Sequence, residues 1–308
     1  LDSAVRFLKH SPDELIEAVR SAERAPAVDP DPPDASEGDV RAAESGGALR
    51  VLELWKQWQQ AGTPDPAAAL AVGHSLIRLA HPTRALEVLE HAGTGPRARQ
   101  LRALAMSSDP ERLDDAIEIL EQLRREGHKD SETLGMLAAR LKQRARMTDN
   151  RTDLRASHAL YLEAFERTRE HYPGINAAST ALGIGAVDDG RRIAAEVQAV
   201  IEATPEAERD RWAAASLGEA HLIQGDLDAA RRHYGAFITR EHSDLRAQVV
   251  MRRQIRWNLE WLDQPTDALD DLFDVPGVAA FVGHMTDAPD RATERFPERC
   301  VAGVRKGI

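Results

Sequence analysis

A run of basic residues in the middle of the chain is the strongest candidate for a binding site. The segment RLKQRARMTDNRTDLR contains six cations: Arg140, Lys142, Arg144, Arg146, Arg151 and Arg155. Such a cluster could hold an anionic ligand or an acidic partner. Cations near a helix C-terminus also complement the helix dipole. The sequence leaves both explanations open, with Arg140, Arg144 and Arg146 as the candidate ligand-binding residues.

A second basic group follows in MRRQIRW, near the end of a long helical pattern, and adds Arg252, Arg253 and Arg256. We include Arg252 and Arg256 among the candidates for a ligand or partner site.

The motifs of common enzymes are missing from the sequence. It has no P-loop, no H-E-x-x-H, no G-x-S-x-G and no paired-cysteine zinc motif, and its histidines are scattered. The glycines Gly183, Gly185 and Gly190 do not follow the G-x-G-x-x-G spacing of a dinucleotide loop. We therefore expect a protein that is not an enzyme, with no cofactor and no metal site.

Composition restricts the fold class and the partners. Hydrophobic residues make up 42% of the 308 residues and charged residues 30%, while aromatic residues are only 5%, which favours helices over sheets. A formal net charge of -11 argues against binding to nucleic acid or to an anionic membrane. Cys300 is the only cysteine, and no run of about 18 apolar residues occurs. These features predict a cytoplasmic protein without disulfides.

A repeat organises the residues from Leu49 onward. A glycine precedes an alanine by twelve residues in three places: Gly73 and Ala85, Gly183 and Ala195, and Gly218 and Ala230. The last two glycines lie 35 residues apart, close to the 34-residue tetratricopeptide period. A small residue in a first helix lets a second helix cross closely, so the pattern predicts stacked helix pairs.

The repeat predicts a different role for each of the three glycines Gly183, Gly185 and Gly190. We expect Gly183 to be the packing glycine, Gly185 to lie near the end of the same helix, and Gly190 to be the turn glycine.

Further helical segments complete the repeat region. Two degenerate units begin near Pro96 and Asp130, and the second has about ten extra residues, ARMTDNRTD, before its partner helix. A long helix at SDLRAQVVMRRQIRWNLEWL should cap the solenoid. It carries one apolar stripe at Leu245, Val249, Ile255, Leu259 and Leu262, and a second at Val250, Trp257 and Trp261.

The two ends differ from the repeat region. Residues 1–25 should be a helical segment, and residues 26–47, rich in Pro, Asp, Ser and Gly, a flexible acidic linker. After a linker at 263–277, residues 278–308 should begin an α/β domain, with a strand at Val278–Val282 and a helix at Pro297–Gly307. His284, Asp287 and Arg291 would lie in its loop. We expect the chain to be part of a longer protein.

The motif HYPGINAAS, preceded by YLEAF and followed by Leu182-Gly183, resembles the TRAFs-binding tetratricopeptide region of apoptosis signal-regulating kinases. Bacterial members of this group are known as tetratricopeptide sensor domains. Asn176 is the polar residue of the motif, and it could cap the next helix or bind a ligand. The tail FVGHMTDAPDRATERFP resembles the start of a Rossmann-like domain of the SLOG type.

The expected fold is therefore all-α: a right-handed, tetratricopeptide-like α-solenoid over residues 48–262, followed by a short β-α unit. The resemblance implies a non-catalytic scaffold or sensor module that regulates a neighbouring effector in a bacterial signalling or defence protein. Its partner would be a protein or the neighbouring domain, and it could form an oligomer. The alternatives are a sensor of a small, nucleotide-type anion, or the regulatory part of an enzyme.

Overall fold

The computed structural model describes residues 37–62, 65–240 and 245–273, and these residues contain 13 α-helices and no strand. The helices of the first half are α3 (Glu37–Glu44), α4 (Gly47–Ala61), α5 (Pro66–Arg78), α6 (Pro82–Leu89), α7 (Pro96–Met106) and α8 (Leu113–Arg125). Those of the second half are α9 (Ser131–Thr148), α10 (Arg151–Thr168), α11 (His171–Gly183), α12 (Val187–Ala203), α13 (Ala213–Gln224), α14 (Leu227–Arg240) and α15 (Leu245–Trp261). The strand and helix expected beyond Gly277 lie outside the described residues, as does the helical segment expected at 1–25.

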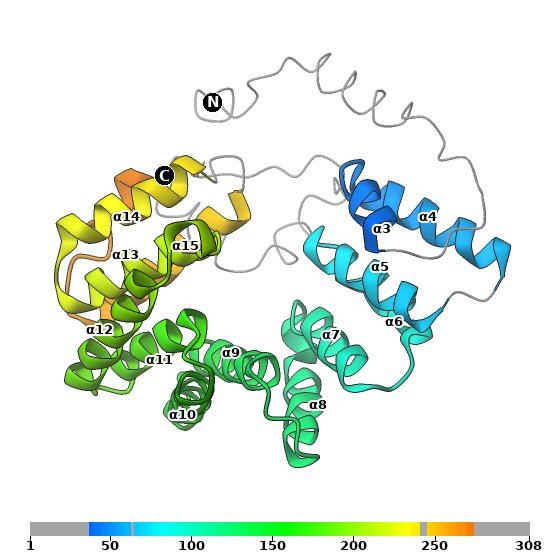
Figure 1. The fold of residues 1–308 in the computed structure, drawn as a ribbon. Helices are drawn as coiled ribbons and strands as arrows, with labels where there is room; N and C mark the ends of the chain where they lie inside the picture. Colours follow the sequence, from blue (N-terminus) through cyan, green and yellow to red (C-terminus); the bar gives the residue numbers. More distant parts are fainter. Residues whose placement is uncertain (1–36, 63–64, 241–244, 274–308) are drawn as a thin grey trace, which may run out of the picture.

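Consecutive helices stack in pairs along a curved array, as the repeat pattern predicts (Figure 1). The pairs are α5 with α6, α7 with α8, α9 with α10, α11 with α12, and α13 with α14. The first helix of each pair also packs against the first helix of the next, and these helices form the inner layer of the curve. This arrangement is consistent with a tetratricopeptide-like solenoid.

The left-handed residue between two paired helices fixes the repeat register. In three of the pairs this residue is Ala80, Gly185 or Gly225, with φ of 62°, 86° and 91°. Seven residues before each lies a buried small residue of the first helix, namely Gly73, Ala178 or Gly218. Five residues after each lies a buried small residue of the second helix, namely Ala85, Gly190 or Ala230. The glycine-alanine prediction is confirmed for the first and last of these units.

The prediction is wrong for the middle unit, where the two small residues are exchanged. Gly185, not Gly190, is the turn glycine, and Gly190 lies inside α12, where an added Cβ would sit 3.0 Å from the carbonyl oxygen of Ala178. Ala195 is exposed, and Gly183 faces Leu154 and Trp261 instead. Equivalent positions in the last two units are therefore 40 residues apart, because the long helix α12 and a 3-10 turn separate them.

The extra residues ARMTDNRTD lengthen helices rather than forming a loop. Both α9 and α10 have 18 residues, and only two residues separate them. Asp149 adopts a left-handed conformation with φ of 54°, and the Asn150 side chain accepts hydrogen bonds from the first backbone N–H groups of α10. A sharp helix end and a strong cap thus allow two long helices to meet at a tight turn.

The ends of the repeat region also differ from the expectation of flexible linkers. Residues 37–44 of the expected linker at 26–47 form α3, because Val40 and Ala43 are buried against the first helix pair. At the other end, residues 263–273 of the expected linker at 263–277 pack on the solenoid through Leu269, which is 2% exposed. Burial of these apolar side chains fixes both segments.

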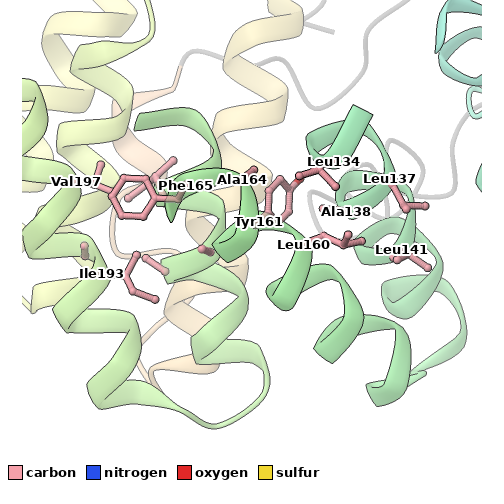
Figure 2. Packing of buried hydrophobic residues seen from close by; sticks show 14 of the residues in the cluster. Leu134, Leu137, Ala138, Leu141, Leu160, Tyr161, Ala164, Phe165, Ile193 and Val197 are labelled. Carbon is pink, nitrogen blue, oxygen red and sulfur yellow. The ribbon is translucent and has the colours of Figure 1, made fainter. Parts of the chain in front are cut away.

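The largest core cluster runs from α7 to α13, and α10 contributes several of its buried side chains (Figure 2). Tyr161 and Phe165 are four residues apart on one face of α10 and are both fully buried. Tyr161 lies beside Leu134 of α9, whereas Phe165 lies beside Val197 of α12 (Figure 2). One helix face therefore joins two neighbouring repeat pairs.

Gly174 of α11 permits the close contact between α10, α11 and α12. A Cβ at this position would lie 2.5 Å from Val197 Cγ2 and 2.6 Å from the Phe165 ring. We expect Gly174→Ala to lower the free energy of unfolding by about 1–3 kcal/mol through overpacking, measured by urea denaturation.

Gly235 of α14 supplies the matched control, since nothing lies within 4 Å of an added Cβ there. Gly235→Ala should stabilise the protein by up to about 1 kcal/mol, because alanine favours the helix more than glycine does. Equal effects of the two substitutions would contradict the packing role of Gly174.

Candidate functional site on the inner face

The basic segment at residues 140–155 does not form a single patch. In a helix, residues four apart share a face, so Lys142 and Arg146 lie on one face of α9, and Arg140 and Arg144 lie on another. Lys142 and Arg146 both contact α15, which lies on the inner side of the curve beside α11 and α13 (Figure 1).

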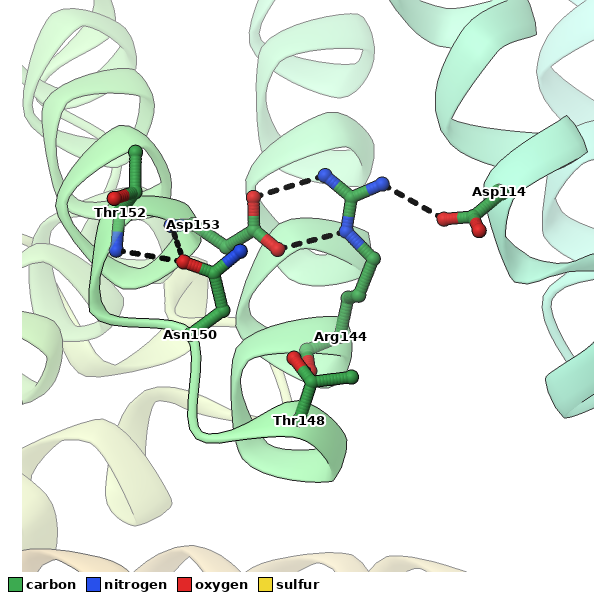
Figure 3. A network of polar contacts seen from close by, with 6 residues as sticks. All are labelled: Asp114, Arg144, Thr148, Asn150, Thr152 and Asp153. Atoms are coloured by element: carbon green, nitrogen blue, oxygen red, sulfur yellow. Dashed lines mark hydrogen bonds and ion pairs between the residues drawn. The ribbon is translucent and has the colours of Figure 1, made fainter.

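Arg144 is bound by two carboxylates of neighbouring helices (Figure 3). Its Nε and Nη2 donate to the two oxygens of Asp153, at 2.7 and 2.8 Å, and its Nη1 donates to Asp114 at 2.7 Å. These hydrogen bonds raise the pKa of Arg144. Arg144 therefore joins α8, α9 and α10, and an external anion would have to compete with both carboxylates.

Arg146 holds α15 against the end of α9. Its Nη2 donates to Glu260 at 2.9 Å, and its guanidinium lies 4.8 Å from the ring centre of Trp257 and 5.4 Å from that of Trp261. A planar guanidinium can stack on aromatic faces while it binds a carboxylate. The tryptophans of the second expected stripe of α15 thus meet an arginine of the solenoid itself.

Lys142 begins a buried polar network between α9, α11 and α15. Its Nζ donates to Asn176 Oδ1 at 2.7 Å and to Gln254 Oε1 at 3.3 Å. Asn176 lies inside α11 and donates to the Tyr172 carbonyl oxygen at 3.0 Å, so it does not cap a helix. The capping role is wrong because α11 already begins at His171, five residues earlier.

Glu219 of α13 completes this network from the opposite side. Its Oε1 accepts from Gln254 Nε2 and from Asn258 Nδ2, both at 2.8 Å. Ser179 accepts from Gln254 at 2.7 Å and donates to Asn258 at 2.6 Å. We call this group the inner polar network; its members are Lys142, Asn176, Ser179, Glu219, Gln254 and Asn258. It joins α15 to three inner helices.

Burial perturbs both charged members of the inner polar network. It lowers the pKa of Lys142 to about 8 and raises the pKa of Glu219. The two side chains attract each other, but the Gln254 amide lies between them, accepting from one and donating to the other. The network therefore places opposite charges in a largely buried interface, where side-chain amides supply their hydrogen bonds.

This arrangement predicts a specific pH dependence of stability. The pKa of Lys142 is about 8 in the folded protein, against an ordinary value of 10.5. Between pH 8 and pH 10.5 the unfolded chain therefore binds more protons than the folded protein. The contribution of Lys142 to the free energy of unfolding should therefore rise from about pH 8 to about pH 10.5, by on the order of 3 kcal/mol. Urea denaturation of wild type and Lys142→Met across this range measures it. Parallel pH profiles for the two proteins would rule out a buried ammonium group.

Arg252 and Arg256 of α15 bind the segment that follows the helix. Arg252 donates to both Asp270 oxygens, at 3.0 and 2.7 Å, and Arg256 lies 3.3 Å from the same carboxylate. Arg231 of α14 binds the neighbouring Asp271 at 2.6 and 3.0 Å. These cations hold residues 263–273 against α14 and α15.

The apolar stripes expected on α15 agree only in part with its buried face. Ile255 and Leu259 are buried as expected, but Val249 and Val250 are 38% and 42% exposed. Ala247 and Met251, with the polar Gln248 and Asn258, take the remaining buried positions. The face turned to the solenoid is more polar than the stripe pattern implies.

Arg140 is the remaining candidate, and it lies apart from α15. Its Nη1 donates to the Ser107 hydroxyl of the α7–α8 connection. The tail residues His284, Asp287 and Arg291 lie outside the described residues.

Comparison with protein-family models gives a match. Residues 48–182 match the sequence model of the family described as Tetratricopeptide Repeats-Sensor. No curated protein matches the chain. Over the described part of the chain, no helix has both the length and the apolar character needed to cross a membrane. The helix pairs continue beyond the matched region, through α14. The resemblance carried by residues 172–176 is confirmed: residues 48–182 are a Tetratricopeptide Repeats-Sensor domain.

Proposed function

We propose that this chain is a non-catalytic sensor module whose solenoid controls a neighbouring effector through the position of α15. The observation that carries the proposal is the docking of α15 on the inner face through the inner polar network. The concave side of a helical solenoid is the surface that such proteins use for binding. In this chain, a helix of the chain itself occupies part of that surface.

A polar interface suits a helix that must move. Buried charges such as Lys142 and Glu219 contribute little net stability, because desolvation offsets their attraction. A ligand or partner that favours a different position of α15 needs only a modest difference in affinity to shift it. An entirely apolar contact of the same size would hold α15 more firmly.

The connection from α15 to the following residues supports a relay. Arg252 and Arg256 attach Asp270 to α15, while Arg231 attaches Asp271 to α14. A shift of α15 relative to α14 would strain this pair of contacts. The signal would then reach residues beyond Phe273, where the sequence predicts the start of a second domain.

We also propose the finer parts that the resemblance implies. These are a right-handed solenoid, a cytoplasmic setting and a role in bacterial signalling or defence, and the match to the Tetratricopeptide Repeats-Sensor family supports them. The partner would be a protein or an adjoining effector domain, since tetratricopeptide domains generally mediate protein interactions.

Cys300 offers a test in the chain as it stands, because it is the only cysteine. Its rate of reaction with a thiol reagent is measured in wild type, in Glu219→Ala, which should release α15, and in Glu219→Gln, which should not. We expect Glu219→Ala to change the rate severalfold and Glu219→Gln to match wild type. The same rate in all three proteins would show that α15 does not control the tail.

A further inference from the structure

A pocket of about 460 Å³ opens between the inner helices of the repeat region, separate from the inner polar network. Its lining comes from α7, α9 and the start of α11 and includes Leu104, Met136, Ala139, Arg140, Glu170 and Tyr172. Small-molecule sites commonly have volumes of about 300–1,000 Å³, mostly apolar walls and a few polar groups. The size and lining of this pocket fit that description.

Arg140 is the unusual member of the lining. Its Nε is buried and has no hydrogen-bond partner, and its Nη1 donates to the neutral hydroxyl of Ser107. In the part of the chain that the structure describes, no carboxylate forms an ion pair with it, and burial lowers its pKa. By contrast, Arg144, Arg146 and Arg252 each bind a carboxylate. The pocket thus contains a desolvated cation that lacks a counter-ion.

Two acidic side chains in the same pocket restrict the type of anion. Glu132 is ion-paired with Arg97 of α7, and its charge is therefore compensated. Glu170 is exposed and accepts a hydrogen bond from the Ser131 hydroxyl at 2.5 Å. A ligand with only negative charge would be repelled by Glu170, whereas one that also carries an N–H donor would satisfy both Arg140 and Glu170.

Tyr172 provides a surface for a flat group. Tyr172 is 53% exposed, and its ring packs edge-on against Tyr161, with ring centres 6.3 Å apart and planes at 82°. A planar ligand could pack on this ring beside Leu104, Met136 and Ala139.

We propose that the pocket binds a small molecule that combines an anionic group, an N–H donor and a planar ring. The anionic group pairs with Arg140, the donor with Glu170 and the ring with Tyr172. Two kinds of molecule have this chemistry. A purine nucleotide combines its ring with a phosphate and an amino group, and an aromatic amino acid combines its ring with a carboxylate and an ammonium group.

Isothermal titration calorimetry on the whole chain distinguishes the two sources. The probes are AMP with adenosine, which lacks the phosphate, and L-phenylalanine with phenylalaninamide, which lacks the carboxylate. We expect either AMP or L-phenylalanine to bind. The matching compound without the anionic group, adenosine or phenylalaninamide, should bind at least tenfold more weakly. Absence of heat from both anionic probes at millimolar concentration would overturn the proposal.

Substitutions then locate the site. Arg140→Met should weaken binding at least tenfold, since it removes a charge-assisted hydrogen bond, and Glu170→Gln and Tyr172→Ala should weaken it severalfold. Arg155→Gln is the matched control, because it removes a charge from an exposed position of α10 outside the pocket.

If circular dichroism shows that Arg140→Met does not fold, the variants at the exposed residues Glu170 and Tyr172 decide whether the ligand binds in this pocket. Binding unchanged by Glu170→Gln and Tyr172→Ala, or weakened equally by Arg155→Gln, would exclude this pocket. None of these variants belongs to the inner polar network, so the result does not depend on the relay.

Discussion

Replacing Glu219 by alanine should release α15 from the inner face of the solenoid. The substitution removes the acceptor shared by Gln254 and Asn258 and leaves Lys142 without its compensating charge. Removing one partner from a buried charged group typically costs about 3–5 kcal/mol. Amide hydrogen exchange in α15 should therefore become at least about a hundredfold faster, while the amides of the outer helices α10 and α12 keep their wild-type rates.

Glu219→Gln is the control for this prediction. Its amide oxygen can still accept from Gln254 and Asn258, so only the attraction to Lys142 is lost. We expect α15 exchange in this variant to stay within about tenfold of wild type. If both variants release α15 equally, charge and not hydrogen bonding holds the helix. If neither does, the inner polar network does not hold it.

Replacing Tyr161 by alanine should destabilise the whole repeat region. Tyr161 of α10 is 1% exposed and belongs to the largest core cluster, where it lies beside Leu134 of α9 (Figure 2) and its ring centre is 6.3 Å from that of Tyr172 of α11. Truncating a large buried aromatic side chain typically costs about 3–5 kcal/mol, through lost burial and the cavity that remains. Urea denaturation should show a lower midpoint with cooperative loss of helices on both sides of α10.

Tyr161→Phe keeps the ring and removes the hydroxyl that interacts with Tyr172. Its cost should be below about 1.5 kcal/mol. A loss confined to α10, with the neighbouring pairs still folded at the same urea concentration, would contradict the idea that one face of α10 joins two repeat pairs.

The repeat could be predicted from sequence because its physical requirement is simple. Two paired helices that cross closely need small residues, and Gly73, Ala85, Gly218 and Ala230 are all buried in the expected order. The second helix approaches each glycine through a large side chain, Leu89 at Gly73 and Tyr234 at Gly218. The middle unit was misassigned because Ala178 and Gly190 meet the same need in reverse order. A search for a glycine before an alanine therefore finds Gly183 and Ala195, which have the right spacing by coincidence.

The inner polar network could not be predicted in the same way. Ser179, Gln254 and Asn258 are ordinary helix residues in a sequence, and their partners lie about 35 to 110 residues away. A signal does exist in α15, where Gln248 and Asn258 interrupt the face that carries Met251, Ile255 and Leu259. Polar residues on the buried face of a helix indicate a partner surface that is itself polar.

The basic residues show why clustering in sequence is a weak guide to a binding site. Four of the candidate arginines bind carboxylates of the chain itself: Arg144, Arg146, Arg252 and Arg256. The acidic partners are either distant in sequence or not marked by any motif. Arg140 differs because no carboxylate among the described residues forms an ion pair with it, although Glu132 and Glu170 line the same pocket. Ligand binding by any of them stays a prediction, and Arg140 is the one that the geometry favours.

The docked position of α15 is the central claim, and a distance measurement tests it most directly. Met147 of α9 and Val250 of α15 are 47% and 42% exposed, so both accept a spin label with little disturbance. In a chain with Met147→Cys, Val250→Cys and Cys300→Ser, pulsed electron resonance should give one narrow distance distribution. Adding Glu219→Ala should broaden it. A broad distribution without Glu219→Ala would mean that α15 does not rest on the inner face, and would contradict the account.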